Sequence, residues 1–182
     1  MAAFATVSDF ATFLQRDLSA PDTATAEMLL DSATQAIKDE VGQTIEVVTE
    51  TVTIYGDGRE LLLLPQIPVT AVTTVTVGGV AWVNNTNFIW ERNGILAALI
   101  DTQGLLGAWT WRKAVVVNYT HGYTPIPKSL QSLCLSLAAR SMASPMSVSS
   151  ESIGNYSVTY AGDTSGMTLT QWEKRMLDRY RA

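Results

Sequence analysis

The chain has 182 residues, of which 47% are apolar and 16% are charged, with one cysteine, one histidine and a formal charge of -5. A lone cysteine excludes an intramolecular disulfide, and the sequence contains no Cys/His cluster that could hold a structural zinc ion. We find neither a basic, apolar leader nor an apolar stretch of membrane-spanning length, and therefore expect a soluble, unexported protein.

The charged residues are few and unevenly distributed. Residues 1–60 carry 11 acidic and 3 basic side chains, whereas no charged side chain occurs from Leu61 to Trp90. Globular domains usually contain about 25% charged residues. A surface this poor in charge is typical of a protein that contacts other subunits.

Two helices are predicted at the start of the chain. Ser8 is a candidate cap for a short first helix, and Pro21 marks the break before a second one. Gly42 is placed to end this second helix. Its apolar residues recur at spacings of three and four, which predicts an amphipathic helix with one buried face: Ala26, Leu29, Leu30, Ala33, Ile37 and Val41.

The next section has the alternation of β-strands. We predict that Thr44–Tyr55 pairs with Leu61–Leu64 as a hairpin across Gly56-Asp57-Gly58. A second hairpin joins Val69–Val77 to Val80–Val83 through Gly78-Gly79.

A further strand is predicted from Trp109 to Tyr119. Its consecutive residues Val115, Val116 and Val117 indicate burial on both faces. The middle of the chain is therefore expected to form a small antiparallel sheet or barrel.

Helical spacing returns after Pro127, which suits a first helical position. Residues 146–167 are rich in Ser, Gly and Thr and predict a flexible arm or a hairpin. Thr170 and Glu173 form a capping box for a short last helix. The apolar face of that helix comprises Leu169, Trp172, Met176, Leu177 and Tyr180. Because about three turns are marginal alone in water, this helix is expected to dock on a neighbour.

These elements predict an α+β fold. Helices from both ends of the chain form a small bundle, with an antiparallel β-sheet or barrel inserted between them and an extended C-terminal arm that ends in a short helix. The expected boundaries are 1–43 for the N-terminal helices, 44–121 for the β domain, 122–145 for the core helix and 146–182 for the arm and docking helix.

The sequence indicates no catalytic residue, no cofactor and no metal site. His121 lies in a turn-like segment, and Cys134 falls on the apolar stripe of a helix. Asp57 is part of a Gly-Asp-Gly sequence that is common in turns. An enzyme that uses His121 with Asp101 or Asp57 is an alternative, although it requires a cleft that the sequence does not reveal.

A carbohydrate-binding or adhesion module is a second alternative. Trp109 and Trp111 are two residues apart on the predicted strand, so both rings would face one side and could stack on a sugar. This alternative predicts a monomer.

The order of parts resembles the head-to-tail connector, or adaptor, proteins of long-tailed double-stranded DNA bacteriophages. The similarity begins with Ala5–Phe10 and the helix around Leu29–Ile37, which look like the family's N-terminal helical pair. It continues with a Tyr-x-x-Gly-Tyr turn that feeds the helix Leu130–Met142. The residues of this structural turn are Tyr119, Gly122, Tyr123 and Pro127.

Two further features of the chain are similar to the family. The β insertion corresponds to Thr44–Tyr119, and the extended arm corresponds to Glu151–Tyr160. The arm is followed by a closing helix, Leu177–Arg181.

The resemblance implies a structural virion protein made in the host bacterial cytoplasm and placed at the head-to-tail neck. Such a protein forms a ring, usually of twelve subunits, beneath the portal protein and extends the DNA channel. Its lower face would meet a stopper, head-completion or tail-terminator protein. Double-stranded DNA would pass through without specific binding, and no membrane is involved.

The resemblance also assigns the portal contact to the C-terminal arm. The residues to which we carry this role are Tyr156, Tyr160, Trp172, Met176, Arg179 and Tyr180. Acidic residues of the first 60 are expected to line the channel, where they would repel DNA phosphates.

Overall fold

Capping residues set the ends of the helices in the computed structural model, which describes residues 3–99, 107–143, 150–153, 156–159 and 166–181. The N-cap of helix α1 (Val7–Leu14) is Thr6, which lies two residues before the predicted cap Ser8. The Thr6 hydroxyl accepts the Asp9 N–H, and the Asp9 carboxylate accepts the Thr6 N–H in return. These hydrogen bonds lower the pKa of Asp9.

Helix α2 (Ala20–Val41) follows the cap residue Ser19 and carries Pro21 in its first turn. It ends at Gly42, as predicted, because Gly42 adopts a left-handed conformation with φ of 70°.

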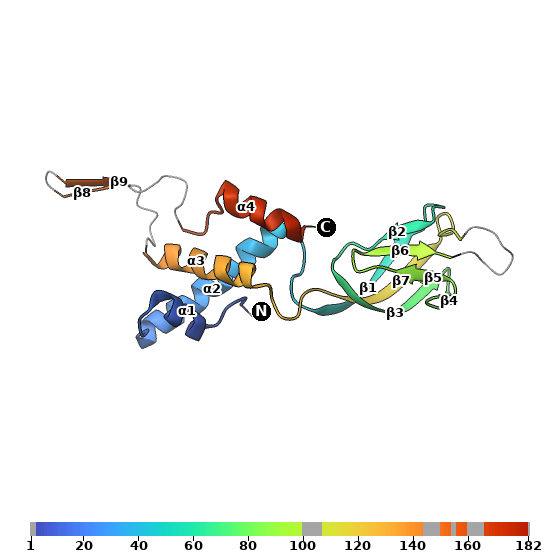
Figure 1. Cartoon of the computed structure of the whole chain (residues 1–182), viewed down its shortest axis with the longest axis horizontal. Coiled ribbons are helices and arrows are strands. Elements are labelled where there is room, and N and C mark those ends of the chain that lie inside the picture. Colours follow the sequence, from blue (N-terminus) through green and yellow to red (C-terminus); the bar gives the residue numbers. More distant parts are fainter. Residues whose placement is uncertain (1–2, 100–106, 144–149, 154–155, 160–165, 182) are drawn as a thin grey trace. The chain divides into compact units, whose positions relative to one another are not determined.

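The chain folds into two compact units, a helical unit formed by residues 1–42 with 126–181 and a β unit formed by residues 43–125 (Figure 1). The helical unit holds α1, α2, α3 (Lys128–Ala143), α4 (Gln171–Leu177) and the 3₁₀ turn η1 (Asp178–Tyr180). The predicted α+β class is therefore confirmed. Within the described residues, no helix has the length and hydropathy needed to cross a bilayer.

The core of the helical unit lies between α2 and α3. Leu30, Ala33 and Ile37 of α2 and Leu130 and Leu137 of α3 are fully buried, as their helical spacing predicted. Cys134 is also buried, and its thiol donates to the Leu30 carbonyl at 3.6 Å. Burial raises the pKa of this thiol, so Cys134 acts as a small apolar core residue.

The last helix packs on the chain's own helical unit. Leu177 is fully buried, and the Tyr180 hydroxyl lies 2.7 Å from the Ser129 hydroxyl of α3. Glu173 is buried and pairs with Arg140 of α3 at 3.3 Å. Leu177 and Tyr180 of the predicted apolar face are therefore covered within the chain's own helical unit, whereas Trp172 of the same face is left exposed.

The β unit contains two antiparallel sheets (Figure 1). The larger sheet has the order β1-β7-β3-β4 and the smaller has the order β2-β6-β5. Their bounds are Val48–Tyr55 (β1), Leu61–Leu63 (β2), Val69–Val77 (β3), Val80–Trp82 (β4), Phe88–Trp90 (β5), Ile95–Ala98 (β6) and Ala114–His121 (β7). The sequence left open whether this unit is a sheet or a barrel, and within the described residues both sheets are open.

One predicted hairpin forms and the other does not. The β3–β4 hairpin turns through Gly78 and Gly79, both with positive φ. By contrast, β1 pairs with β7 and β2 pairs with β6. The β1–β2 connection binds a distant segment instead, since the Gly56 N–H donates to the Lys113 carbonyl and the Gly58 N–H to the Trp109 carbonyl.

The core of the β unit lies between the two sheets and is closed by Trp109. Trp109 is fully buried, stacks on Trp82 with ring centroids 5.1 Å apart, and donates its indole N–H to the Glu60 and Leu96 carbonyls. Val115 and Val117 are buried but Val116 is half-buried, so the prediction of burial on both faces was wrong for this strand.

Gly122 follows β7 in a conformation that glycine favours. Its φ is 105°, and a Cβ added there would lie 2.2 Å from the Glu46 carbonyl oxygen. The Gly122 N–H donates to the Pro68 carbonyl, and the next residue, Tyr123, donates its N–H to the Ile45 carbonyl. The end of β7 is thereby held against both neighbouring segments.

A third, two-stranded sheet pairs β8 (Ser150–Ile153) with β9 (Tyr156–Thr159) in antiparallel fashion. Of the two alternatives predicted for residues 146–167, the described backbone therefore shows the paired strands of a hairpin.

A partly buried polar cluster lies at the inner side of β1 and β7. The Tyr119 hydroxyl donates to Glu50 Oε1 at 2.6 Å, and both burial and this hydrogen bond raise the pKa of Tyr119. His121 is at the end of β7 and buried, not in a turn. Its Nε2 lies 3.4 Å from Glu50 Oε1, yet neither ring nitrogen makes a hydrogen bond with the described residues.

Burial lowers the pKa of His121, and the charge of Glu50 offsets only part of this effect. In the unfolded chain histidine titrates near pH 6.5, so below that pH the unfolded state binds more protons than the folded state. The contribution of His121 to the free energy of unfolding is therefore present above about pH 6.5 and is lost as the pH falls.

We predict that His121→Phe reduces the drop in the free energy of unfolding between neutral pH and about pH 5, because the folded chain then no longer excludes a proton there. Urea unfolding at a series of pH values measures this difference. His121 is the only histidine, so identical pH profiles for the variant and the parent chain would contradict the assignment.

Candidate assembly surfaces

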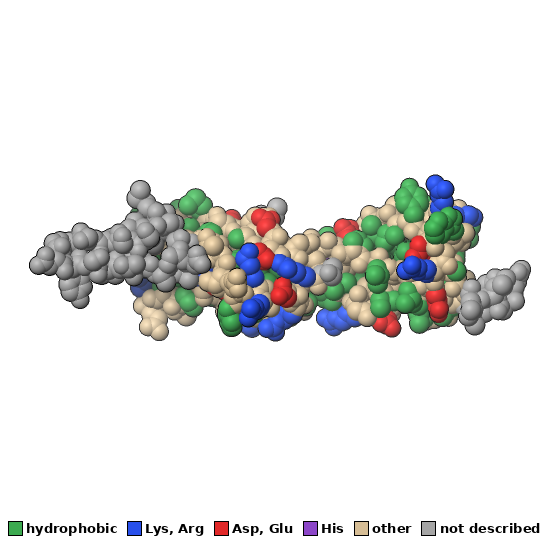
Figure 2. Space-filling model, turned by 90° about the horizontal axis from the view of Figure 1, so that it is seen from above, with side chains coloured by type: hydrophobic (Ala, Val, Ile, Leu, Met, Phe, Trp, Pro, Cys, Tyr) green, Lys and Arg blue, Asp and Glu red, His purple; other side chains and the backbone are tan. Residues whose placement is uncertain are grey.

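Large apolar side chains are exposed on both units. On the helical unit they are Phe13, Met28 and Trp172, one each from α1, α2 and α4. On the β unit they include Tyr55, Leu61, Leu63, Val80, Val83 and Trp111. Figure 2 shows hydrophobic side chains gathered in several groups over the β unit, with charged side chains between and around them.

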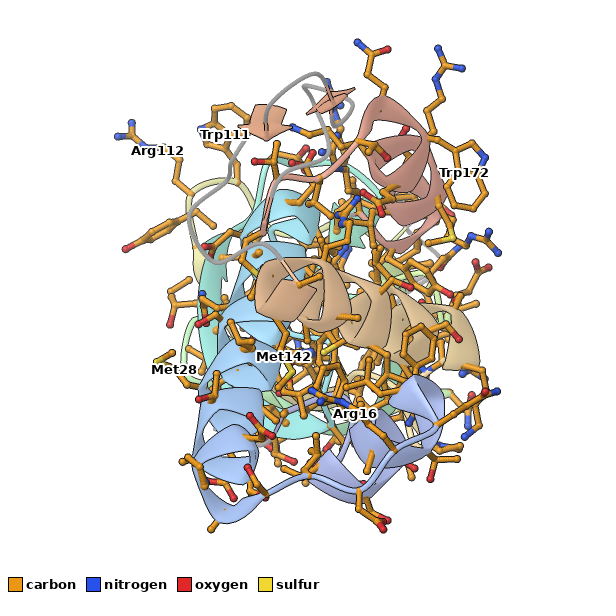
Figure 3. All side chains as sticks on the ribbon, turned by 90° about the vertical axis from the view of Figure 1, so that its left-hand side faces the viewer. Arg16, Met28, Trp111, Arg112, Met142 and Trp172 are labelled. Atoms are coloured by element: carbon orange, nitrogen blue, oxygen red, sulfur yellow. The ribbon has the colours of Figure 1, made fainter. Side chains whose placement is uncertain are left out.

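The outer side of α4 combines aromatic and basic groups. Trp172 is 70% exposed, although the sequence placed it on the apolar face of the helix. Figure 3 shows its ring projecting away from the neighbouring helices. Arg175, Met176 and Arg179 follow at helical spacing on the same side, and Met176 is half-buried.

The inner side of α4 is held by ion pairs as well as by apolar packing. Glu40 of α2 pairs with Lys174 at 3.1 Å and with Arg181. Together with the buried residues Leu177 and Tyr180, these pairs fix the rotation of α4. Trp172 is left on the outside as a consequence.

The predicted arm residues therefore differ in position. Trp172 and Arg179 are exposed and Met176 is half-buried, whereas Tyr180 is buried against α3 and is unsuited to a direct contact. The side chain of Tyr156 and the whole of Tyr160 lie outside the described residues.

The predicted turn residues lie at the junction of β7 and α3. Tyr119 is in β7, and Gly122 and Tyr123 bond to the segments described above. Pro127 immediately precedes α3, and its carbonyl accepts the N–H groups of Leu130 and Gln131 in the first turn of the helix.

A shallow groove of about 280 Å³ runs between α1 and α3. Its lining mixes apolar, polar and charged groups and includes the exposed ring of Phe13. The lining residues are Ala5, Asp9, Thr12, Phe13, Lys128, Gln131, Ser132 and Leu135.

Acidic groups form a stripe on the outside of α2, which we define as the acidic stripe. Glu27, Asp31 and Asp39 are exposed and lie four or eight residues apart, so they share one side of the helix. Gln35 completes the spacing and donates to Asp39 Oδ1 at 2.7 Å. Three of the eleven acidic residues of the first 60 thus share one side of α2, where Lys38 lines the same hollow as Asp31 and Gln35.

The residues considered for catalysis are not gathered into one site. Cys134 is in the core of the helical unit and His121 is in the core of the β unit. Asp57 is exposed and pairs with Arg59 at 3.5 Å, and Asp101 lies outside the described residues. Within the described residues, no three His, Cys, Asp or Glu side chains gather as metal ligands would.

The tryptophan pair proposed for carbohydrate binding is also separated. Both residues precede β7 instead of lying on it, and Trp109 is fully buried whereas Trp111 is 66% exposed. The prediction that both rings face the same side was wrong, and it was the basis of that alternative.

Comparisons with known structures show a shared fold. A chain of the structure described as the neck of an empty gene transfer agent (GTA) particle, computed with C6 symmetry, is 16% identical, with a TM-score of 0.58 over 100% of this chain and 93% of that chain. A chain of the virion of a native GTA particle is also 16% identical, with a TM-score of 0.59 and the same coverage.

A third similar chain comes from the neck of a native GTA particle, computed with C12 symmetry. It is 16% identical, with a TM-score of 0.54 over 97% of this chain and 87% of that chain. No curated protein matches the chain.

The family comparison covers almost the entire chain. The model of the head completion protein family matches residues 3–182. This match and the neck structures agree with the predicted head-to-tail connector and with its localisation in the neck of a virion. The chain belongs to the head completion protein family.

Proposed function

We propose that this chain is the head-to-tail adaptor of its particle. In this role, copies of the chain form a ring beneath the portal protein, with the twelve subunits that the resemblance implies. The ring extends the DNA channel and offers its lower face to a stopper or tail protein. The observation that carries the proposal is the match of residues 3–182 to the head completion family.

The exposed apolar side chains support an assembled state. Isolated soluble proteins rarely expose contiguous apolar patches of large area, because such patches drive association. Here both units expose large apolar residues, while the charged residues of the β unit lie mostly in loops. A shared fold with chains from particle necks is consistent with this reading.

We expect purified chain mixed with the portal protein of its particle to form rings, because the portal supplies a symmetric template for the exposed apolar groups. Negative-stain electron microscopy and native mass spectrometry measure ring formation and subunit number. A chain that stays a lone monomer in the presence of all other neck proteins would overturn the proposal.

The portal contact is assigned to the outer side of α4. Trp172 is a large exposed aromatic ring flanked by Arg175 and Arg179, and aromatic residues and arginine are the residue types that dominate binding energy at protein interfaces. Tyr180, which the sequence analysis assigned to the portal contact, is instead an anchor, since it holds α4 in place from the inside.

We predict that Trp172→Ala weakens portal binding by about tenfold or more, as removal of an interface anchor does. Because Trp172 is exposed, the free energy of unfolding should change by no more than about 0.5 kcal/mol. Surface plasmon resonance and urea unfolding measure the two effects.

Two variants control this test. Met28→Ala removes an equally exposed apolar group from α2 and should leave portal binding unchanged. Leu177→Ala should instead cost about 2–5 kcal/mol of stability, because it empties a buried position.

Unaltered binding of Trp172→Ala would exclude the outer side of α4 as the contact. Deletion of the whole helix is a poorer test, since it also removes Leu177 from the core.

The acidic stripe of α2 is assigned to the wall of the DNA channel. A line of carboxylates repels phosphates and prevents the tight binding that would hold a genome in place. Glu27, Asp31 and Asp39 have this character, whereas the acidic residue Glu40 is engaged by Lys174 and Arg181.

We predict that Glu27→Lys combined with Asp31→Lys slows DNA release from assembled particles severalfold, because the new cations bind the passing phosphates. Dye fluorescence after triggered release measures the rate. The control variant, Asp57→Lys with Glu91→Lys, makes the same change in net charge in loops of the β unit. Equal rates for the two variants would place the stripe outside the channel.

A further inference from the structure

The outer face of the smaller sheet is aliphatic within its strands, and Glu91 lies opposite Ile95 at one end of it. Along β2, β5 and β6, buried and exposed residues alternate, so that every second side chain points away from the core. The outward residues form two cross-strand rows through the register Leu61↔Ala97↔Ile89 and Leu63↔Ile95. We name these five residues the aliphatic face.

Within this face Leu61, Leu63 and Ile89 are exposed, and Leu63 is 68% exposed. Such a cluster of leucine and isoleucine side chains costs free energy in contact with water, at about 25 cal/mol per Å² of apolar surface. The face is therefore a surface that gains stability when another molecule covers it.

The outer face of the larger sheet is uncharged and rich in threonine. In its centre two cross-strand rows follow the register of β1, β7 and β3, namely Thr51↔Asn118↔Thr74 and Thr53↔Val116↔Thr76. We name these six residues the threonine face.

Some of the polar groups at and beside this face bond to one another. The Asn118 side chain donates to the Thr51 hydroxyl at 2.8 Å, and in the adjacent row the hydroxyls of Thr49 and Thr120 are 2.8 Å apart. A polar group that keeps its partner can lose water at low cost. Asn118 and Thr51 can therefore be covered without losing their bond, whereas the hydroxyls of Thr53, Thr74 and Thr76 have no such partner among the described residues.

Charge is sparse on both faces, with Glu91 at the end of the aliphatic face. Within strands β1–β7 the only Asp, Glu, Lys or Arg is Glu50, and it accepts a hydrogen bond from the Tyr119 hydroxyl on the core side. The remaining charges of the described β unit lie outside these strands. Because the core lies between the sheets, the aliphatic face and the threonine face are on opposite sides of the β unit.

We propose that the aliphatic face of one copy of this chain packs on the threonine face of the next copy. This inference rests on the proposed ring. A closed ring repeats one head-to-tail contact, which requires two different, complementary surfaces on opposite sides of each subunit. The β unit has two different surfaces of this kind on opposite sides, one mainly aliphatic and one uncharged and rich in threonine.

Cysteine cross-linking in assembled rings tests the contact. The native Cys134 is buried, so a short bismaleimide reports only introduced thiols. A chain with both Leu63→Cys and Thr53→Cys should give a ladder of dimers, trimers and larger species. Each single variant should give no multimers, because in a head-to-tail contact a residue never meets its own copy.

Val80 provides the matched control. It is 64% exposed in the same unit and pairs with the inward residue Val77 at the sheet edge, so it belongs to neither face. The combination of Val80→Cys with Thr53→Cys should therefore give no ladder. In a second measurement, Leu63→Asp should lower ring yield by at least about tenfold, since it buries an unpaired charge, whereas Val80→Asp should not.

The outcomes separate the two proposals. Absence of rings from the parent chain with its portal overturns the proposed function, and the contact with it. Rings in which the double variant stays uncross-linked overturn the contact alone and indicate that another neck protein covers the faces. Dimers from Leu63→Cys alone likewise overturn it, because they show the aliphatic face packed on itself.

Discussion

The position of β7 between β1 and β3 is the constraint on which the β unit depends. It joins segments that are 65 and 42 residues away in sequence, as the pairs Val52↔Val117 and Val75↔Val117 show. Because strand residues alternate, this one register fixes two surfaces at once. Val115, Val117 and Tyr119 enter the core, and the half-buried residues between them become the centre of the threonine face.

The same alternation explains how a chain with so few charges can fold and still carry surfaces for assembly. The inner sides of both sheets are filled by apolar residues and closed by Trp109. The outer sides are not balanced by charge, as they would be in a typical isolated domain. The shortage of charge seen in residues 61–90 is therefore a property of exposed faces and not only of the core.

The helical unit divides its last helix between two roles. Leu177 and Tyr180 pack inward, and Glu40 and Arg140 hold the charged side chains of the same segment. Trp172 is left exposed on the other side. A helix anchored in this way presents its outer groups in a defined orientation, which reduces the conformational entropy lost when a partner binds. The proposed contact thus needs no folding step on binding.

The sequence by itself determined the helices, the β3–β4 hairpin and the resemblance to connectors, because caps, helical spacing and tight turns depend on residues a few positions apart. Only the tertiary structure decided which strand pairs with β1, that Trp109 is buried while Trp111 is exposed, and that α4 docks on its own chain. These outcomes depend on contacts between segments far apart in sequence, whose register and packing no local pattern encodes.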